Sequence, residues 1–119
     1  MVRSTSRSDF ARIMPLDELA EGKIELVQVD GNDVLVTKVD GAVYAVRNIC
    51  THGGAPLSMG KRYGSTIQCP GHGSVFDLKT GRGSYPARRQ LITYDVKIED
   101  KWVLIGRVPI ERIFPFTKK

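Results

Sequence analysis

The chain has 119 residues, of which 41% are hydrophobic and 26% are charged, and its formal net charge is +5. A chain of this length builds one hydrophobic core, so we expect a single domain over residues 1–119. The composition is typical of a globular protein and excludes a disordered chain. No apolar stretch approaches the roughly 18 residues that cross a bilayer, so we expect no membrane anchor.

The basic residues are scattered along the chain, with short doublets only at 61–62, 88–89 and 118–119. They are not interleaved with aromatic residues as in single-strand binding sites, so we expect no nucleic-acid partner. We interpret the charge as a solvated surface; the alternative is a field that steers an acidic protein partner. We expect residues 1–9 to be a flexible basic tail rather than a transit peptide, and the lack of an apolar signal region indicates the cytoplasm.

Taken in chain order, the hydrophobic pattern predicts an all-β chain. One short helix candidate, residues 16–20, precedes the first clear strand. Alternating and β-branched segments then predict strands at 23–29, 34–38, 42–47, 91–99 and 102–105. In the segment 91–99, the residues Ile92, Tyr94, Val96 and Ile98 are expected to share one buried face.

Two hairpin turns are predicted where an aspartate precedes a glycine, at Asp30-Gly31 and Asp40-Gly41. Glycine adopts the positive φ that a tight turn between antiparallel strands requires. The strands around these turns are therefore expected to form an antiparallel meander.

The strand pattern weakens over residues 49–84, where eight glycines occur. Glycine allows the backbone to approach another group closely and to adopt conformations that side chains forbid. Both cysteines and both histidines of the chain also fall within this segment. We predict that it forms a separate set of binding loops, and that residues 107–119 form a C-terminal extension.

The cysteines and histidines occur as two mixed pairs, Cys50 with His52 and Cys69 with His72. Three interpretations compete. A structural disulfide would leave both histidines without a role and does not suit a reducing compartment. A tetrahedral zinc site in an interaction module needs this ligand set, but zinc motifs usually pair cysteine with cysteine and histidine with histidine. A Rieske-type iron-sulfur cluster uses two cysteines and two histidines.

The segments CTHGGAPLSMG (50–60) and CPGHGSVFDLKTG (69–81) closely resemble the two cluster-binding boxes of Rieske proteins, and the length and flanking strands resemble a Rieske-type ferredoxin. The resemblance implies a Rieske-like antiparallel β sandwich or meander with a two-loop cluster-binding subdomain inserted. It also implies one 2Fe-2S cluster, with Cys50 and Cys69 on the inner iron and His52 and His72 on the outer iron.

Further roles follow from the same resemblance. Gly53, Gly54 and Gly73 are expected to direct backbone N–H groups at the cluster sulfurs, plain turn glycines being the alternative. The Ser74 hydroxyl is expected to donate to a sulfur; the alternative is a hydroxyl satisfied by its own backbone. Tyr85 and Pro86 resemble the loop that covers the cluster, although a solvent-exposed turn there is the other interpretation.

Three positions depart from the high-potential respiratory members of the family. Those proteins have two extra cysteines where this chain has Ala55 and Gly71, so no disulfide can bridge the loops. They also have a tyrosine where this chain has Phe76. Losing that phenol should lower the reduction potential, and keeping Ser74 should partly offset the loss.

The resemblance predicts a monomeric one-electron carrier between a reductase and a terminal oxygenase or other redox partner. The alternatives are a respiratory-type or pH-linked Rieske carrier of higher potential and the zinc-stabilised module. We expect no catalytic activity, because a mononuclear oxygenase iron needs two further histidines and the chain has only the two already assigned.

Overall fold

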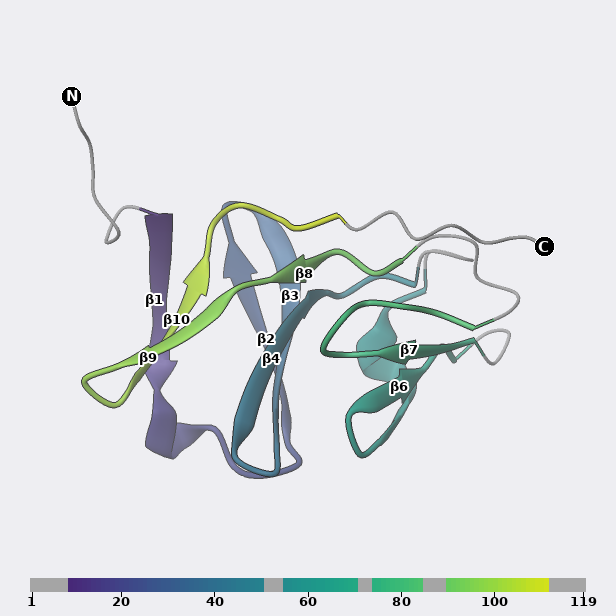
Figure 1. Ribbon diagram of the computed structural model, residues 1–119, viewed down its shortest axis with the longest axis horizontal. Helices are drawn as coiled ribbons and strands as arrows, with labels where there is room; N and C mark the ends of the chain where they lie inside the picture. The colour runs from purple at the N-terminus through teal and green to yellow at the C-terminus, as the bar shows by residue number, and fades with distance from the viewer. Residues whose placement is uncertain (1–8, 51–54, 71–73, 85–89, 112–119) are drawn as a thin grey trace.

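The computed structural model describes residues 9–50, 55–70, 74–84 and 90–111, and these residues are almost entirely in β-strands, turns and loops (Figure 1). The helix candidate at 16–20 is one turn of 3₁₀ helix, Leu16–Glu18, and a second such turn is Leu57–Met59. No helix among the described residues is long and apolar enough to span a membrane. The strands are β1 Phe10–Pro15, β2 Ile24–Val29, β3 Asn32–Val39, β4 Ala42–Arg47, β5 Lys61–Tyr63, β6 Thr66–Gln68, β7 Val75–Asp77, β8 Thr93–Tyr94, β9 Val96–Glu99 and β10 Trp102–Gly106.

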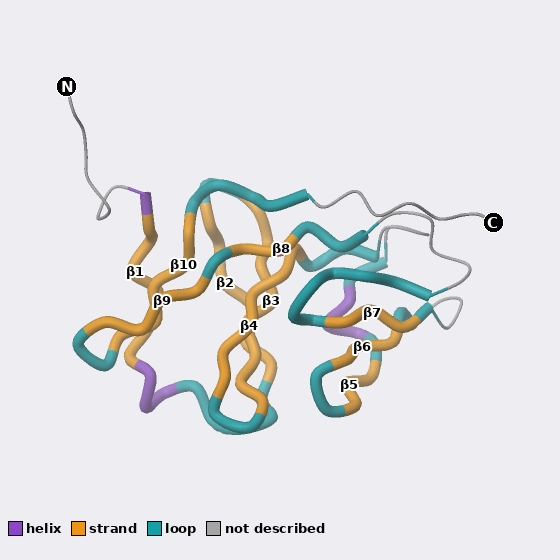
Figure 2. The backbone as a smooth tube through the Cα atoms, viewed as in Figure 1, coloured by secondary structure: helices purple, strands orange, loops and turns teal. Residues whose placement is uncertain are grey.

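These strands form three antiparallel sheets, with orders β1-β10-β9, β2-β3-β4-β8 and β5-β6-β7. Figure 2 shows the four-stranded sheet between the other two in the view drawn. Residues 48–92 leave the four-stranded sheet after β4 and return to it at β8, and they contain the whole β5-β6-β7 sheet. The all-β prediction is confirmed.

The four-stranded sheet is buried on both faces because its central strand alternates between two cores. Val34 and Val36 of β3 belong to a cluster with Val103 and Ile105 of β10. Leu35, between them, belongs to a second cluster that includes residues from the β5-β6-β7 sheet. All three β3 residues are fully buried. The four-stranded sheet therefore supports residues 48–92, called here the inserted segment, on one face and the β1-β10-β9 sheet on the other.

The strand predicted over residues 91–99 is wrong as a continuous element, because the chain changes sheets at Asp95. β8 pairs with β4 in one sheet, β9 pairs with β10 in another, and the Asp95 carbonyl accepts a hydrogen bond of 2.8 Å from the Gly106 N–H. Ile92, Tyr94 and Val96 do pack on one core as predicted. Ile98 does not, since it lies on the edge strand β9 and is 46% exposed.

The predicted hairpin turns are confirmed, with positive φ at Asp30, Gly31, Asp40 and Gly41. The carboxylate of Glu21 accepts hydrogen bonds from the backbone N–H groups of Asp40 and Gly41. Nothing in the local sequence pattern indicates this contact, since Glu21 is nearly twenty residues away along the chain. The turn is thus held by a side chain from the segment before β2.

The hairpin between β9 and β10 has Asp100 and Lys101 in the left-handed region, at φ 53° and 65°. A residue with a side chain pays about 1–2 kcal/mol for that conformation, whereas glycine adopts it freely but loses more chain entropy on folding. We expect Lys101→Gly to stabilise the fold by about 0.5–1 kcal/mol, measured as a higher denaturation midpoint in Trp102 fluorescence. The control Lys97→Gly, within β9, should lower the midpoint; an equal shift for both variants would contradict the prediction.

Candidate metal centre

Each predicted cysteine ligand follows shortly after a strand. Cys50 lies three residues beyond the end of β4, and Cys69 directly follows β6. The segment between β4 and Cys50 is held on the four-stranded sheet, because the Asn48 N–H donates to the carbonyl of Asp33 in β3 at 2.9 Å. The two thiols are thus carried on segments that leave two different sheets.

The two loops that begin at the cysteines are closed in the same way. The Cys50 N–H donates to the Ala55 carbonyl at 2.7 Å, and the Cys69 N–H donates to the Ser74 carbonyl at 2.7 Å. In both loops the acceptor lies five residues after the cysteine. This equivalence was not apparent from the ligand spacing, because the histidines lie two residues after one cysteine and three after the other. One backbone hydrogen bond therefore joins the described residues at the two ends of each loop.

Both thiols lie in one apolar cluster. Cys50 is 1% exposed and Cys69 is 2% exposed, and they share this cluster with Leu57, Ile67 and Phe76. The structure has no disulfide between them. Two thiols in one water-excluded region are suited to hold a metal-sulfur centre from its buried side.

Side-chain contacts fix the segments beside the thiols. Asn48 accepts a hydrogen bond from the Ser58 N–H at 2.8 Å and donates to the Ser58 hydroxyl at 3.2 Å. A Cβ at Gly60 would lie 1.9 Å from the Gln68 carbonyl oxygen, so only glycine fits there. The segment 58–60 is therefore packed against the residues that flank both cysteines, a feature that no motif had indicated.

Ser74 has the property expected of a group that hydrogen-bonds to a cluster. Its side chain is fully buried, and its hydroxyl oxygen has no hydrogen-bond partner among the described residues. Its own backbone therefore does not satisfy the hydroxyl. A buried polar group without a partner costs about 1–3 kcal/mol, which a cluster sulfur as acceptor would recover. This unpaired hydroxyl and the two buried thiols fit a 2Fe-2S cluster.

The remaining predicted positions lie outside the described residues, so the described part of the chain holds half of the predicted ligand set. Accordingly, no group of three potential metal ligands occurs within it. The positions outside it are His52, Gly53, Gly54, His72, Gly73, Tyr85 and Pro86, and also Gly71.

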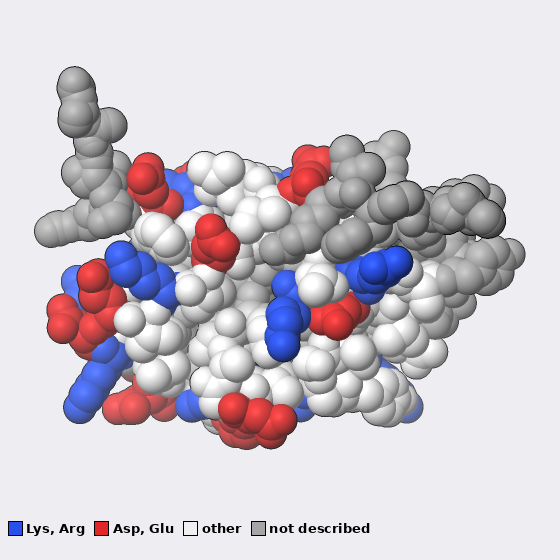
Figure 3. Space-filling model, in the orientation of Figure 1, with Lys and Arg blue, Asp and Glu red and all other residues white. Residues whose placement is uncertain are grey.

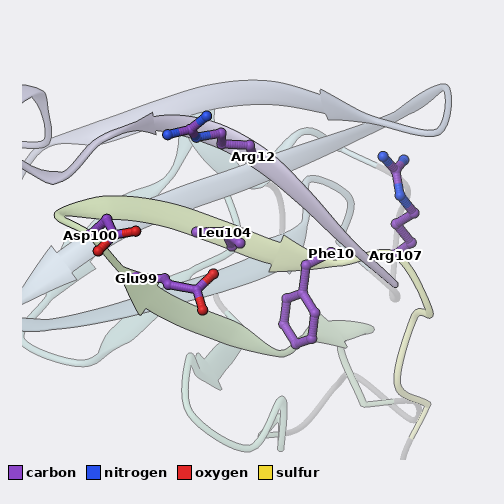
Figure 4. A pocket seen from close by; sticks show the side chains of 6 residues that line it. All are labelled: Phe10, Arg12, Glu99, Asp100, Leu104 and Arg107. Atoms are coloured by element: carbon purple, nitrogen blue, oxygen red, sulfur yellow. The ribbon is translucent and has the colours of Figure 1, made fainter. Parts of the chain in front are cut away.

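A pocket of about 400 Å³ lies elsewhere, on the β1-β10-β9 sheet (Figure 4). Arg12 and Arg107 face it together with Glu99 and Asp100, so its charges balance. Phe10 and Leu104 supply its apolar wall. None of the predicted cluster residues lines this pocket.

The comparisons with known proteins agree with the fold and the buried thiols. The family model for the Rieske [2Fe-2S] domain matches residues 9–95. The ferredoxin component of the naphthalene 1,2-dioxygenase/salicylate 5-hydroxylase systems of Ralstonia sp is 40% identical over 76% of this chain and 88% of its own length. The ferredoxin component of the naphthalene 1,2-dioxygenase system of Pseudomonas aeruginosa is 42% identical over the same shares.

Two solved structures are also similar. The ferredoxin of carbazole 1,9a-dioxygenase from Nocardioides aromaticivorans IC177 has a TM-score of 0.76 at 34% identity, covering 82% of this chain and 96% of that one. A chain from a complex of reduced oxygenase and oxidized ferredoxin in carbazole 1,9a-dioxygenase has a TM-score of 0.80 at 28% identity, covering 87% of this chain and 98% of that one.

The fold and the site thus define a Rieske iron-sulfur protein. The chain belongs to the Rieske [2Fe-2S] domain family, and among its members it is a small Rieske-type ferredoxin. The predicted family, fold and 2Fe-2S cofactor are confirmed.

The unpaired hydroxyl of Ser74 leads to a test of its role. A hydrogen bond contributes about 0.5–1.5 kcal/mol to a neutral acceptor and about 1.5–3 kcal/mol to a charged one, so it stabilises the reduced, more negative cluster by about 1–1.5 kcal/mol more than the oxidised one. Ser74→Ala should therefore lower the reduction potential by roughly 40–65 mV for one electron. The potential would be measured by redox titration of the visible spectrum.

Thr37→Val is the matched control, because Thr37 is equally buried but its hydroxyl donates to the Lys23 carbonyl at 2.7 Å. This control should reduce stability and leave the potential unchanged. An unchanged potential in Ser74→Ala would show that the Ser74 hydroxyl does not act on the cluster.

Proposed function

We propose that this chain carries single electrons from a reductase to the terminal oxygenase of a dioxygenase system. Cys50, Cys69, His52 and His72 hold the cluster, within cluster-binding loops that span about residues 49–84 of a single domain. The observation that carries the proposal is the pair of buried thiols on residues whose N–H groups make equivalent backbone hydrogen bonds, together with the buried Ser74 hydroxyl, which has no hydrogen-bond partner among the described residues.

The names of the relatives support the direction of transfer. Five relatives are ferredoxin components of naphthalene or dinitrotoluene dioxygenase systems, and a further one is a ferredoxin subunit of 3-phenylpropionate/cinnamic acid dioxygenase. The similar carbazole structure contains a ferredoxin together with its oxygenase. A terminal oxygenase is therefore the acceptor that best suits this chain.

When bound, a Rieske cluster supplies reversible one-electron chemistry at potentials between about −150 and +300 mV. The residues of this chain determine where the potential falls within that range. Neutral imidazoles at His52 and His72 would raise it relative to four thiolates, and Ser74 would raise it further. Phe76, fully buried beside the thiols, has no hydroxyl to add to this effect.

The carrier is expected to have no catalytic activity of its own. The chain contains two histidines in all, and both are assigned to the cluster, so none remains for a mononuclear oxygenase iron. We propose that it acts as a monomer with protein partners and without nucleic acid. The cytoplasm suits it, since two thiols that must remain unoxidised for ligation persist best in a reducing compartment.

The first test is spectroscopic and functional. The purified chain should be red-brown, should give an electron paramagnetic resonance signal after reduction, and should pass electrons to the terminal oxygenase of the naphthalene 1,2-dioxygenase system. Oxidation of the reduced cluster would be followed in the visible spectrum. A colourless protein with one bound zinc ion would refute the proposal and support a zinc-stabilised module instead.

The ligand assignment has its own test. His52→Cys would replace a neutral imidazole with a negatively charged thiolate, so the reduction potential should fall toward that of four-cysteine ferredoxins, about −400 mV. The potential would be measured by the same redox titration. Ser58→Cys adds a thiol near the loop without replacing a proposed ligand, and it should leave the potential almost unchanged. An unchanged potential in His52→Cys would argue against His52 as a ligand.

A further inference from the structure

The charge of the chain is divided unevenly between the inserted segment and the rest. Residues 48–92 contain six of the 18 basic residues and only one of the 13 acidic ones, Asp77. Their net charge is therefore +5, equal to that of the whole chain, and the charges of the remaining residues sum to zero. The basic residues in the segment are Lys61, Arg62, Lys79, Arg82, Arg88 and Arg89.

The scaffold, which comprises the described residues outside the inserted segment, has a negative net charge. Residues 9–47 and 93–111 contain twelve acidic and seven basic residues, a net charge of −5. In the view of Figure 3, acidic and basic side chains lie together at the end formed by β1, β9 and β10, and further acidic side chains lie along the lower edge. Within the described residues, the segment that carries the cysteines has four basic residues and one acidic residue, a net charge of +3, so the positive pole of the described structure lies on that segment.

Two exposed apolar side chains lie on that positive segment, close in the chain or in the fold to the residues that flank the cysteines. Ile49, directly before Cys50, is 41% exposed, and Met59 is 73% exposed. The two are brought near each other because Asn48 and Ser58, their neighbours in the chain, are joined by two hydrogen bonds.

Lys61 follows Met59 by two residues. It lies opposite Gln68 in the pairing of β5 with β6, and Gln68 directly precedes Cys69. Its side chain is exposed. An apolar centre with a charged border is the usual composition of a protein–protein contact surface.

We propose that Ile49, Met59 and Lys61 form a docking surface for an acidic redox protein, oriented by the positive pole of the inserted segment. This inference rests on the proposed electron-carrier function and specifies the chemistry of its partner. Charge complementarity selects the partner, because a positive pole attracts and orients an acidic surface and repels a basic one. The small apolar centre suits a transient contact, as electron-transfer complexes are among the smallest interfaces.

The field is tested with two small oxidants of opposite charge. The chain, reduced beforehand with dithionite, would give one electron per molecule to ferricyanide, an anion, or to hexaamminecobalt(III), a cation. Raising the ionic strength from about 10 to about 200 mM shortens the screening length, so the ferricyanide rate should fall and the cobalt rate should rise. Stopped-flow absorbance would measure both rates.

Variants separate the local field from the total charge. Lys61→Gln should lower the ferricyanide rate about two- to threefold at low salt. Lys101→Gln removes the same charge from the β9–β10 hairpin and should change the rate much less. Equal effects of the two variants, or a cobalt rate that falls with salt, would overturn the proposed positive pole.

The apolar centre is tested with a protein acceptor. Met59→Ser should slow electron transfer to plastocyanin, an acidic protein, several-fold and leave the ferricyanide rate unchanged. Val108→Ser is the matched control, since Val108 is 72% exposed on the scaffold. Equal rates for both variants with plastocyanin would overturn the docking surface.

If the wild-type chain reduced neither small oxidant, the electron-carrier function itself would fail, and the docking surface with it.

Discussion

The structure depends on a four-stranded sheet that is buried on both faces. Successive residues of β3 enter different cores, so one strand stabilises both the scaffold and the inserted segment. Leu35 and Val46 on one face lie in the same cluster as Cys50 and Cys69. The position of the thiols is therefore determined by the packing of the sheet, and a change in its register would move both thiols.

Burial of the thiols also restricts the charge of the centre that we propose they hold. Placing net charge in an apolar region costs several kcal/mol, and the cost grows with the charge. Two ferric ions, two sulfides and two thiolates sum to zero when the other ligands are neutral imidazoles, whereas four thiolates would leave two negative charges. An apolar cluster around Cys50 and Cys69 thus favours the mixed ligand set over four cysteines. The mixed ligand set and the hydrophobic core are therefore both compatible with a cluster of no net charge.

The features that could be predicted from the sequence are those with local physical causes. The turns at Asp30-Gly31 and Asp40-Gly41 were predictable because two adjacent residues determine the backbone there. The break at Asp95 was not, because the alternation of apolar residues continues through it and only pairing with different sheets separates β8 from β9. The contacts of Glu21 with the Asp40 turn and of Asn48 with Ser58 join residues that share no motif. Likewise, the motifs identified the cysteines, but their burial in one cluster emerged only from the packing of distant strands.

The strands at which the inserted segment begins and ends are neighbours, since Ala45 and Val46 of β4 pair with Tyr94 and Thr93 of β8. A segment whose two ends lie side by side can change in length or composition with little effect on the sheet that carries it. The redox unit and its scaffold are in this sense separable parts of one chain. Evolution can alter the charge around the cluster, and with it the choice of partner, while the core of the scaffold stays constant. A scaffold of this kind is also suited to receive the corresponding segment of a related ferredoxin.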